Sequence, residues 1–232
     1  MKASLLCLFV AALLPLTGRA DLTMVQQVEG GGPVSVITIK LKGDKARIEA
    51  AQMTTLMDGK TGDIITLMNA QKKFVRISGD KAKAIAEMAS KYSGTTATSE
   101  KPKPTATGRK ETINGYETEE YVWETPKLKA SYWIAPKFPD GPAIMKQLQA
   151  ATPTLWNDIA KGMLDYHDLP GIALRTKIKL GNKDITSTIT SVKQDPLSDA
   201  EFSPPTDFQE LKIPNVPDMS GDKPASAPSA KP

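Results

Sequence analysis

The sequence has little of the side-chain chemistry on which most catalytic and metal sites depend. Among 232 residues it holds one cysteine and one histidine. Cys7 lies within the first 20 residues, so the rest of the chain can form no disulfide, thiolate metal site or cysteine nucleophile. His167 alone offers a metal one imidazole nitrogen, whereas a structural zinc site takes four ligands, mostly cysteine or histidine. We therefore expect neither a metal nor another cofactor.

Strong charge and long apolar runs are also absent. The formal net charge is +4, and Lys2 and Arg19 contribute two of the positive charges, so nothing indicates nucleic-acid binding. The longest apolar run, Leu5–Leu14, is too short to cross a hydrocarbon layer of about 30 Å. A basic start, that run and the small residues of Gly18–Ala20 are typical of a secretory signal. We predict a signal peptide over residues 1–20 and an exported protein, periplasmic or extracellular, without a membrane span.

Alternating apolar and polar residues predict a series of short antiparallel strands. In the segment Ser35–Leu41, Ile37 and Ile39 share one face and Lys40 lies on the other, and glycine-containing turns precede and follow this segment. Polar residues alternate with the apolar ones along the strands, which is typical of a sheet with one wet face. The same pattern predicts strands within residues 22–28, 46–50, 54–78, 111–113, 116–124, 128–135 and 172–193.

Helical spacing of apolar residues predicts helices over Asp80–Tyr92 and Ile144–Ala150, and a further helix that begins at Thr152-Pro153. Residues 93–108 are rich in Ser, Thr, Pro and Lys and read as a long surface loop, and residues 220–232 read as a disordered tail. Together these elements predict an α+β fold, in which a curved antiparallel sheet (a half-barrel) wraps around two or three helices. We place it in a single domain over residues 21–219.

Several short segments resemble known families. The turn Asp58-Gly59-Lys60-Thr61 between strands, followed by Lys72-Lys73-Phe74, resembles the lipoprotein-carrier fold of the bacterial periplasm, which implies a half-barrel over an apolar cavity. From Gly108 to Leu211 the chain resembles the secreted bacterial domain-of-unknown-function family numbered forty-four twelve. The matching stretches are Glu111–Tyr121, Tyr132–Ala135, Thr190–Lys193 and Phe202–Pro205. This second resemblance implies a fold and carries no catalytic residues.

The remaining candidates for catalysis have simpler explanations. Ser78–Lys81 and Lys60–Gly62 match two motifs of penicillin-binding enzymes in reversed order, without the third motif between them. The acids of Glu117–Glu124 could pair for glycoside chemistry. Alternation explains Glu117 and Glu119 as the solvent side of a strand, although Glu120 fits neither face. We therefore expect a protein that is not an enzyme.

The leading hypothesis is that the space between sheet and helices binds a lipid or another apolar small molecule. Soft, unbranched methionines are spread over the predicted sheet and helices, and such side chains suit either an adaptable apolar site or an ordinary core. The expected lining is Ile37, Ile39, Ile48, Met68, Trp156, Met163, Leu174 and Ile178. The alternative is an envelope interaction module with a filled core, whose basic strand residues meet an unidentified protein partner or an anionic polymer: Arg175, Lys177 and Lys179.

Overall fold

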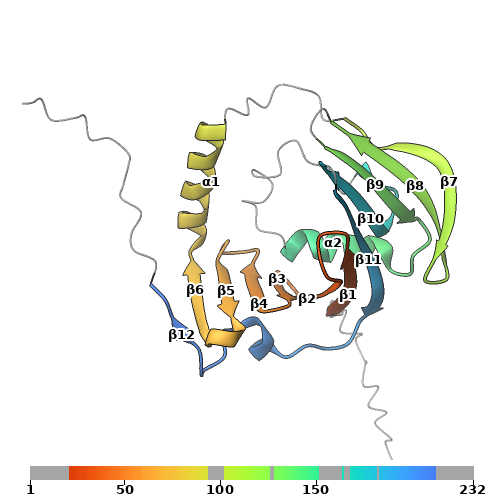
Figure 1. Ribbon diagram of the computed structural model, residues 1–232. Helices are drawn as coiled ribbons and strands as arrows, with labels where there is room; N and C mark the ends of the chain where they lie inside the picture. The colour runs from red at the N-terminus through yellow and green to blue at the C-terminus, as the bar shows by residue number, and fades with distance from the viewer. Residues whose placement is uncertain are drawn as a thin grey trace, which may run out of the picture.

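The computed structural model describes residues 21–93, 102–125, 128–151, 164, 168–181 and 183–212. Within them the chain forms one open sheet of 12 strands and two α-helices (Figure 1). The strands are β1 (Leu22–Glu29), β2 (Ser35–Lys42), β3 (Lys45–Ala50), β4 (Met53–Asp58), β5 (Ile64–Met68), β6 (Lys73–Ile77), β7 (Thr105–Ile113), β8 (Tyr116–Glu124), β9 (Lys129–Ala135), β10 (Ile172–Leu180), β11 (Lys183–Lys193) and β12 (Gln209–Glu210), and the helices are α1 (Gly79–Ser93) and α2 (Gly141–Ala151).

Two antiparallel meanders make up the sheet, whose order is β12-β6-β5-β4-β3-β2-β1-β11-β10-β9-β8-β7. The first runs from β1 to β6 and the second from β7 to β11, and the pairing of β1 with β11 joins them. Tight turns allow neighbouring strands to pair directly. Between β7 and β8, Asn114 and Gly115 both adopt positive φ angles, 51° and 82°, as a two-residue hairpin turn requires.

The main core lies where α2 packs on the sheet. Its buried members include Leu22, Leu41 and Leu174 from the strands and Ile144 from the helix. The side-chain amide of Gln147 on α2 donates a hydrogen bond of 3.3 Å to the backbone oxygen of Leu41, which satisfies that amide inside the core. Helix α2 contacts β2 and β3, so it fixes the middle of the sheet.

A C-terminal segment closes the opposite face of β3–β6. We call Leu197–Leu211 the strap; it contains a short 3-10 helix, η3 (Asp199–Phe202), and β12. Phe208 of the strap packs against a buried cluster formed by Leu56, Ile65, Leu67 and Phe74. Strand β12 pairs with β6 in parallel, and the backbone amide of Leu211 donates to the oxygen of Phe74 at 2.7 Å.

Ion pairs and hydrogen bonds hold the start of the strap. Lys40 Nζ lies 2.6 Å from a carboxylate oxygen of Glu201, and Lys42 Nζ donates to the backbone oxygen of Leu197 at 2.6 Å. The Arg47 guanidinium donates to the backbone oxygen of Glu201 at 2.8 Å. The polar side chains of β2 and β3 therefore bind the strap in place instead of facing open water.

Most of the predicted strands and helices are present in the described residues. A large antiparallel sheet with helices is confirmed; two α-helices lie in the described part of the chain, and the sheet is unclosed. Helix α1 extends beyond β6, and its Ile85 is 47 % exposed (Figure 1). The sheet therefore leaves this side chain of α1 uncovered.

One predicted loop boundary was wrong, and three predicted segments lie outside the described residues. The loop expected over residues 93–108 extends too far, because β7 begins at Thr105, which pairs with Val122 of β8. The signal peptide, the helix from Thr152-Pro153 and the tail lie outside the described residues. No helix in the described ranges is both long and apolar enough to cross a membrane.

A substitution of Phe202 tests how much the strap contributes to stability. Phe202 is 8 % exposed, so Phe202→Ala removes a buried ring and leaves a cavity, which should lower the free energy of unfolding by about 3 kcal/mol. Leu211→Ala is the matched control, since Leu211 is 37 % exposed, and its cost should stay below about 1 kcal/mol. Urea unfolding followed by circular dichroism measures both; equal costs would contradict a sealing role for the strap.

Candidate functional site

Four of the predicted lining residues lie on one face of the sheet. Ile39 pairs with Ile48, Ile37 pairs with Ala50, and Met68 pairs with Met53, and directly paired residues point to the same side. We call this side of β2–β6 the inner face. Its apolar members are Ile37, Ile39, Leu41, Ala46, Ile48, Ala50, Met53, Met57, Ile64, Met68, Val75 and Ile77.

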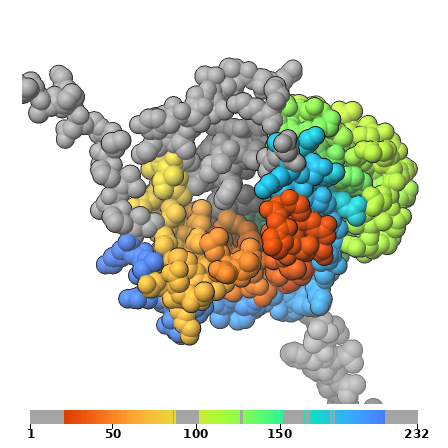
Figure 2. Space-filling view, in the orientation of Figure 1, coloured from red at the N-terminus to blue at the C-terminus, as the bar shows by residue number. Residues whose placement is uncertain are grey.

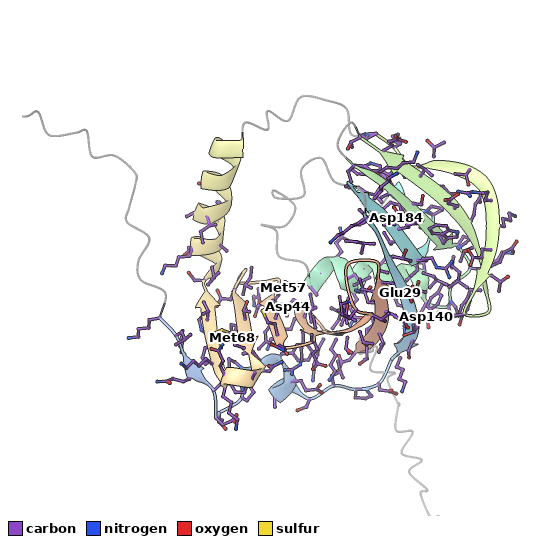
Figure 3. All side chains as sticks on the ribbon, in the orientation of Figure 1. Glu29, Asp44, Met57, Met68, Asp140 and Asp184 are labelled. Carbon is purple, nitrogen blue, oxygen red and sulfur yellow. The ribbon has the colours of Figure 1, made fainter. Side chains whose placement is uncertain are left out.

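The inner face is only partly covered. Leu41 and Ala46 are buried where α2 packs, but Ile37, Ile48 and Met68 are half-buried. Met53 is 55 % exposed, although it carries a large apolar side chain. Figure 3 labels Met57 and Met68, on the neighbouring strands β4 and β5 of this face. The inner face therefore extends as an apolar surface beyond the part that α2 covers.

Two of the other four predicted residues, Leu174 and Ile178, lie on β10 and pack in two different clusters. Leu174 is fully buried in the main core, whereas Ile178 packs against a second cluster that includes Trp123 and Tyr132. The pairing of β10 with β9 shifts register between Ala173 and Arg175, so a bulge lies between the two residues' contacts with β9. Trp156, Met163 and also His167 lie outside the described residues.

A pocket lined mostly by polar residues lies over β1, β11, β10 and β9. It has a volume of about 460 Å³ and is open to solvent. Its lining residues are Gln27, Glu29, Trp133, Arg175, Lys177, Thr186, Thr188 and Thr190. We call it the polar groove. Thr186, Thr188 and Thr190 alternate along β11, and all three line it.

Ion pairs balance the basic residues of this groove. The Arg175 guanidinium lies 5.7 Å from the centre of the Trp133 ring and donates to Glu111 at 2.7 Å. Lys177 Nζ lies 3.0 Å from a carboxylate oxygen of Asp184. The groove is therefore nearly neutral, which weakens the expectation that an anionic polymer binds there.

A buried carboxylate lies at the bulge of β7, on a residue whose role the sequence left open. Glu120 is 1 % exposed. It accepts hydrogen bonds from Thr107 Oγ1 at 2.9 Å and from Arg109 Nε at 2.6 Å, and a second Arg109 nitrogen also pairs with it. Both partners belong to the stretch where the pairing of β7 with β8 is interrupted. Alternation along β8 could not show them, because they come from another strand.

The Glu120 carboxylate is held in its ionised form. Burial is the largest influence and opposes ionisation, but the hydrogen bonds from Thr107, Arg109 and Ser131 and the charge of Arg109 together lower the pKa below its usual 4.5. A carboxylate with a lowered pKa is a poor proton donor or acceptor near neutral pH. These contacts join β7, the last strand of the sheet, to β8, and we call the cluster the clasp.

Comparison with known proteins identifies the family. The profile of the domain of unknown function DUF4412 matches residues 17–208. The chain belongs to the DUF4412 family. No curated protein matches it.

Several solved structures are similar to this DUF4412 protein at low identity. PNGF-II in a C2 crystal form is 15 % identical with a TM-score of 0.41; the match covers 82 % of the DUF4412 chain but 31 % of PNGF-II, so the chain spans about a third of that protein. A DUF1329 family protein from Desulfovibrio piger is 14 % identical, with 81 % and 90 % of the two chains covered and a TM-score of 0.34. LprF from Mycobacterium bovis is 13 % identical, with 77 % and 87 % covered and a TM-score of 0.35.

Glu120→Gln tests the clasp. The variant keeps the shape but loses the charge that Arg109 and Thr107 bind, so the free energy of unfolding at pH 7 should fall by about 1 to 3 kcal/mol. The folded-state pKa is lowered, so the stabilising effect is complete above pH 4.5 and disappears as the pH falls through the folded-state pKa.

Urea unfolding of the wild type and Glu120→Gln at several pH values measures this effect. The difference between them should shrink as the pH falls below about 4. Glu117→Gln is the control, since the Glu117 side chain is 69 % exposed and its loss should change little. A difference that is constant from pH 7 to pH 3 would contradict the clasp.

Proposed function

We propose that this DUF4412 protein is an exported, non-enzymatic binding protein that holds the acyl chain of a lipid against the inner face of β2–β6. The basic start and apolar run of residues 1–20 support export. The inner face supports the choice of ligand, because most of the side chains that neighbouring strands place on it are apolar.

One observation carries the proposal. The strands β4–β6 are apolar on both faces, with Leu56, Ile65, Leu67 and Phe74 on one side and Met53, Met57, Ile64 and Met68 on the other. The strap closes the first side. The second side is half-buried or exposed, and an apolar surface of that kind is typical of a ligand site.

The residues of the inner face suit a flexible chain. Burying each methylene contributes about 0.8 kcal/mol, so a long acyl chain can bind with no specific polar contact. Met53, Met57 and Met68 are unbranched and polarisable, so they can adjust to chains of different length and saturation. Thr55 and Thr66, in the middle of this face, are small enough to leave space above the sheet.

The polar groove favours a second candidate function, an interaction module that binds its partner on the surface. Its supporting observation is the volume of about 460 Å³ beside Trp133 and Arg175. In that case Arg175→Ala would abolish binding of the partner. The inner face would bind no ligand in either the wild type or the variant. The two candidates therefore differ in which face of the sheet is occupied.

A charge in the middle of the inner face tests the acyl-chain proposal. Thr66 pairs with Thr55 on β4 and Val75 on β6, so Thr66→Lys places an ammonium group among apolar side chains. An acyl chain cannot cover this group without removing its water, which is costly. We expect the affinity for a fluorescent fatty acid to fall at least about tenfold, which corresponds to about 1.4 kcal/mol.

Thr112→Lys is the matched control, because Thr112 is exposed on β7, and it should bind the fatty acid like the wild type. Circular dichroism checks that both variants fold. The proposal would be contradicted if the wild type bound no fatty acid, or if Thr66→Lys bound it with unchanged affinity.

A further inference from the structure

Large apolar side chains are exposed at one end of the sheet. Val34 is 59 % exposed, Val36 56 % and Met53 55 %, and they are the three most exposed large hydrophobic residues among those described. They lie at two hairpin tips, Gly30–Val36 between β1 and β2, and Ala50–Met53 between β3 and β4. In Figure 2 the red atoms of the first hairpin belong to the surface that faces the viewer.

The two tips are neighbours. Strands β2 and β3 pair directly, with Ile37 opposite Ala50, so the residues that precede Ile37 lie beside those that follow Ala50. Ala51 is exposed as well. We call Val34, Val36, Ala51 and Met53 the apolar tip surface.

Charge is distributed unequally between the two ends of these strands. Neither Gly30–Val36 nor Ala50–Met53 contains a charged residue. At the opposite end, the turns Lys42–Lys45 and Asp58–Asp63 are built largely from lysine and aspartate. Apolar groups gathered at one end, without charge, suit insertion into the boundary between lipid headgroups and acyl chains.

A positively charged turn lies next to the apolar tip surface. Gly30 packs so closely on the backbone oxygen of Asp184 that a Cβ there would lie 1.7 Å from it, which places the β1–β2 tip against the turn between β10 and β11. Lys179 and Lys183 flank this turn, and both are exposed. Asp184 is already paired with Lys177, so the turn carries excess positive charge, which attracts anionic lipid headgroups.

We propose that the apolar tip surface docks on a lipid bilayer that contains anionic lipid, with Val34 and Val36 inserted and Lys179 and Lys183 on the headgroups. This inference rests on the proposed function and extends it. Ile37, Ala50, Met53 and Met68 lie at the same end of the inner face. An acyl chain can therefore pass between the bilayer and the inner face at this end, past the uncharged turns between β1 and β2 and between β3 and β4.

The experiment measures co-sedimentation of the purified protein, expressed in a host that exports it, with vesicles of phosphatidylcholine alone or mixed with phosphatidylglycerol. We expect the wild type to bind the mixed vesicles. The double variant Val34→Ser/Val36→Ser should bind them with an affinity at least about tenfold lower. Lys179→Glu/Lys183→Glu should remove the preference for phosphatidylglycerol. Ile85→Ser/Leu211→Ser is the matched control: it removes two other exposed apolar residues, 47 % and 37 % exposed, and should bind like the wild type.

A fatty-acid titration without vesicles separates this inference from the proposed function. Val34→Ser/Val36→Ser should bind the fatty acid like the wild type, because both valines lie outside the inner face. Wild-type protein that binds fatty acid but no vesicles would overturn the docking inference alone. Equal vesicle binding by the valine variant and its matched control would overturn it too, whereas loss of fatty-acid binding in the wild type would count against the proposed function.

Discussion

The strands β4–β6 have large apolar side chains on both faces. An antiparallel sheet usually leaves one face polar and solvated. Here Leu56 and Leu67 on one face and Met57 and Met68 on the other make that solution impossible. The strap covers these side chains on one face, and we propose that a bound acyl chain covers them on the other.

The strap, Leu197–Leu211, covers the face that holds Leu56 and Leu67. The strap combines two aromatic side chains, Phe202 and Phe208, with ion pairs such as Lys40–Glu201 and Lys72–Asp207. It also caps the edge of β6 with β12, which protects backbone groups that could otherwise pair with another molecule. At the other edge the sheet ends in β7, which the Glu120–Arg109 clasp holds in place.

Much of the fold could be predicted because its signals are local. Alternation in Ser35–Leu41 and the turns around it define a hairpin without reference to the rest of the chain, and consecutive hairpins bring Ile39, Ile48 and Met68 onto one face. Helix α2 was likewise visible from the spacing of Ile144 and its neighbours.

The remainder depends on contacts that are distant in sequence. The strap residues around Pro204 have no periodic pattern, and Phe202 is buried only because β3–β6 provide an apolar surface for it. Leu174 and Ile178 were expected to line one cavity, but the register shift in β10 accompanies their packing in different clusters. Glu120 could not be assigned from β8 alone, because its partners come from a bulged stretch of β7 that was expected to be a loop up to Gly108.

The most direct test of the central claim is to find where a bound acyl chain lies. A fatty acid with a photoreactive group at its tail can be cross-linked to the protein, and mass spectrometry then identifies the labelled peptides. If the acyl chain binds where we propose, the labels should lie on inner-face residues of β2–β6, such as Ile39, Ile48, Met57 and Met68. Labels confined to the polar groove around Trp133, or to the strap, would contradict this proposal.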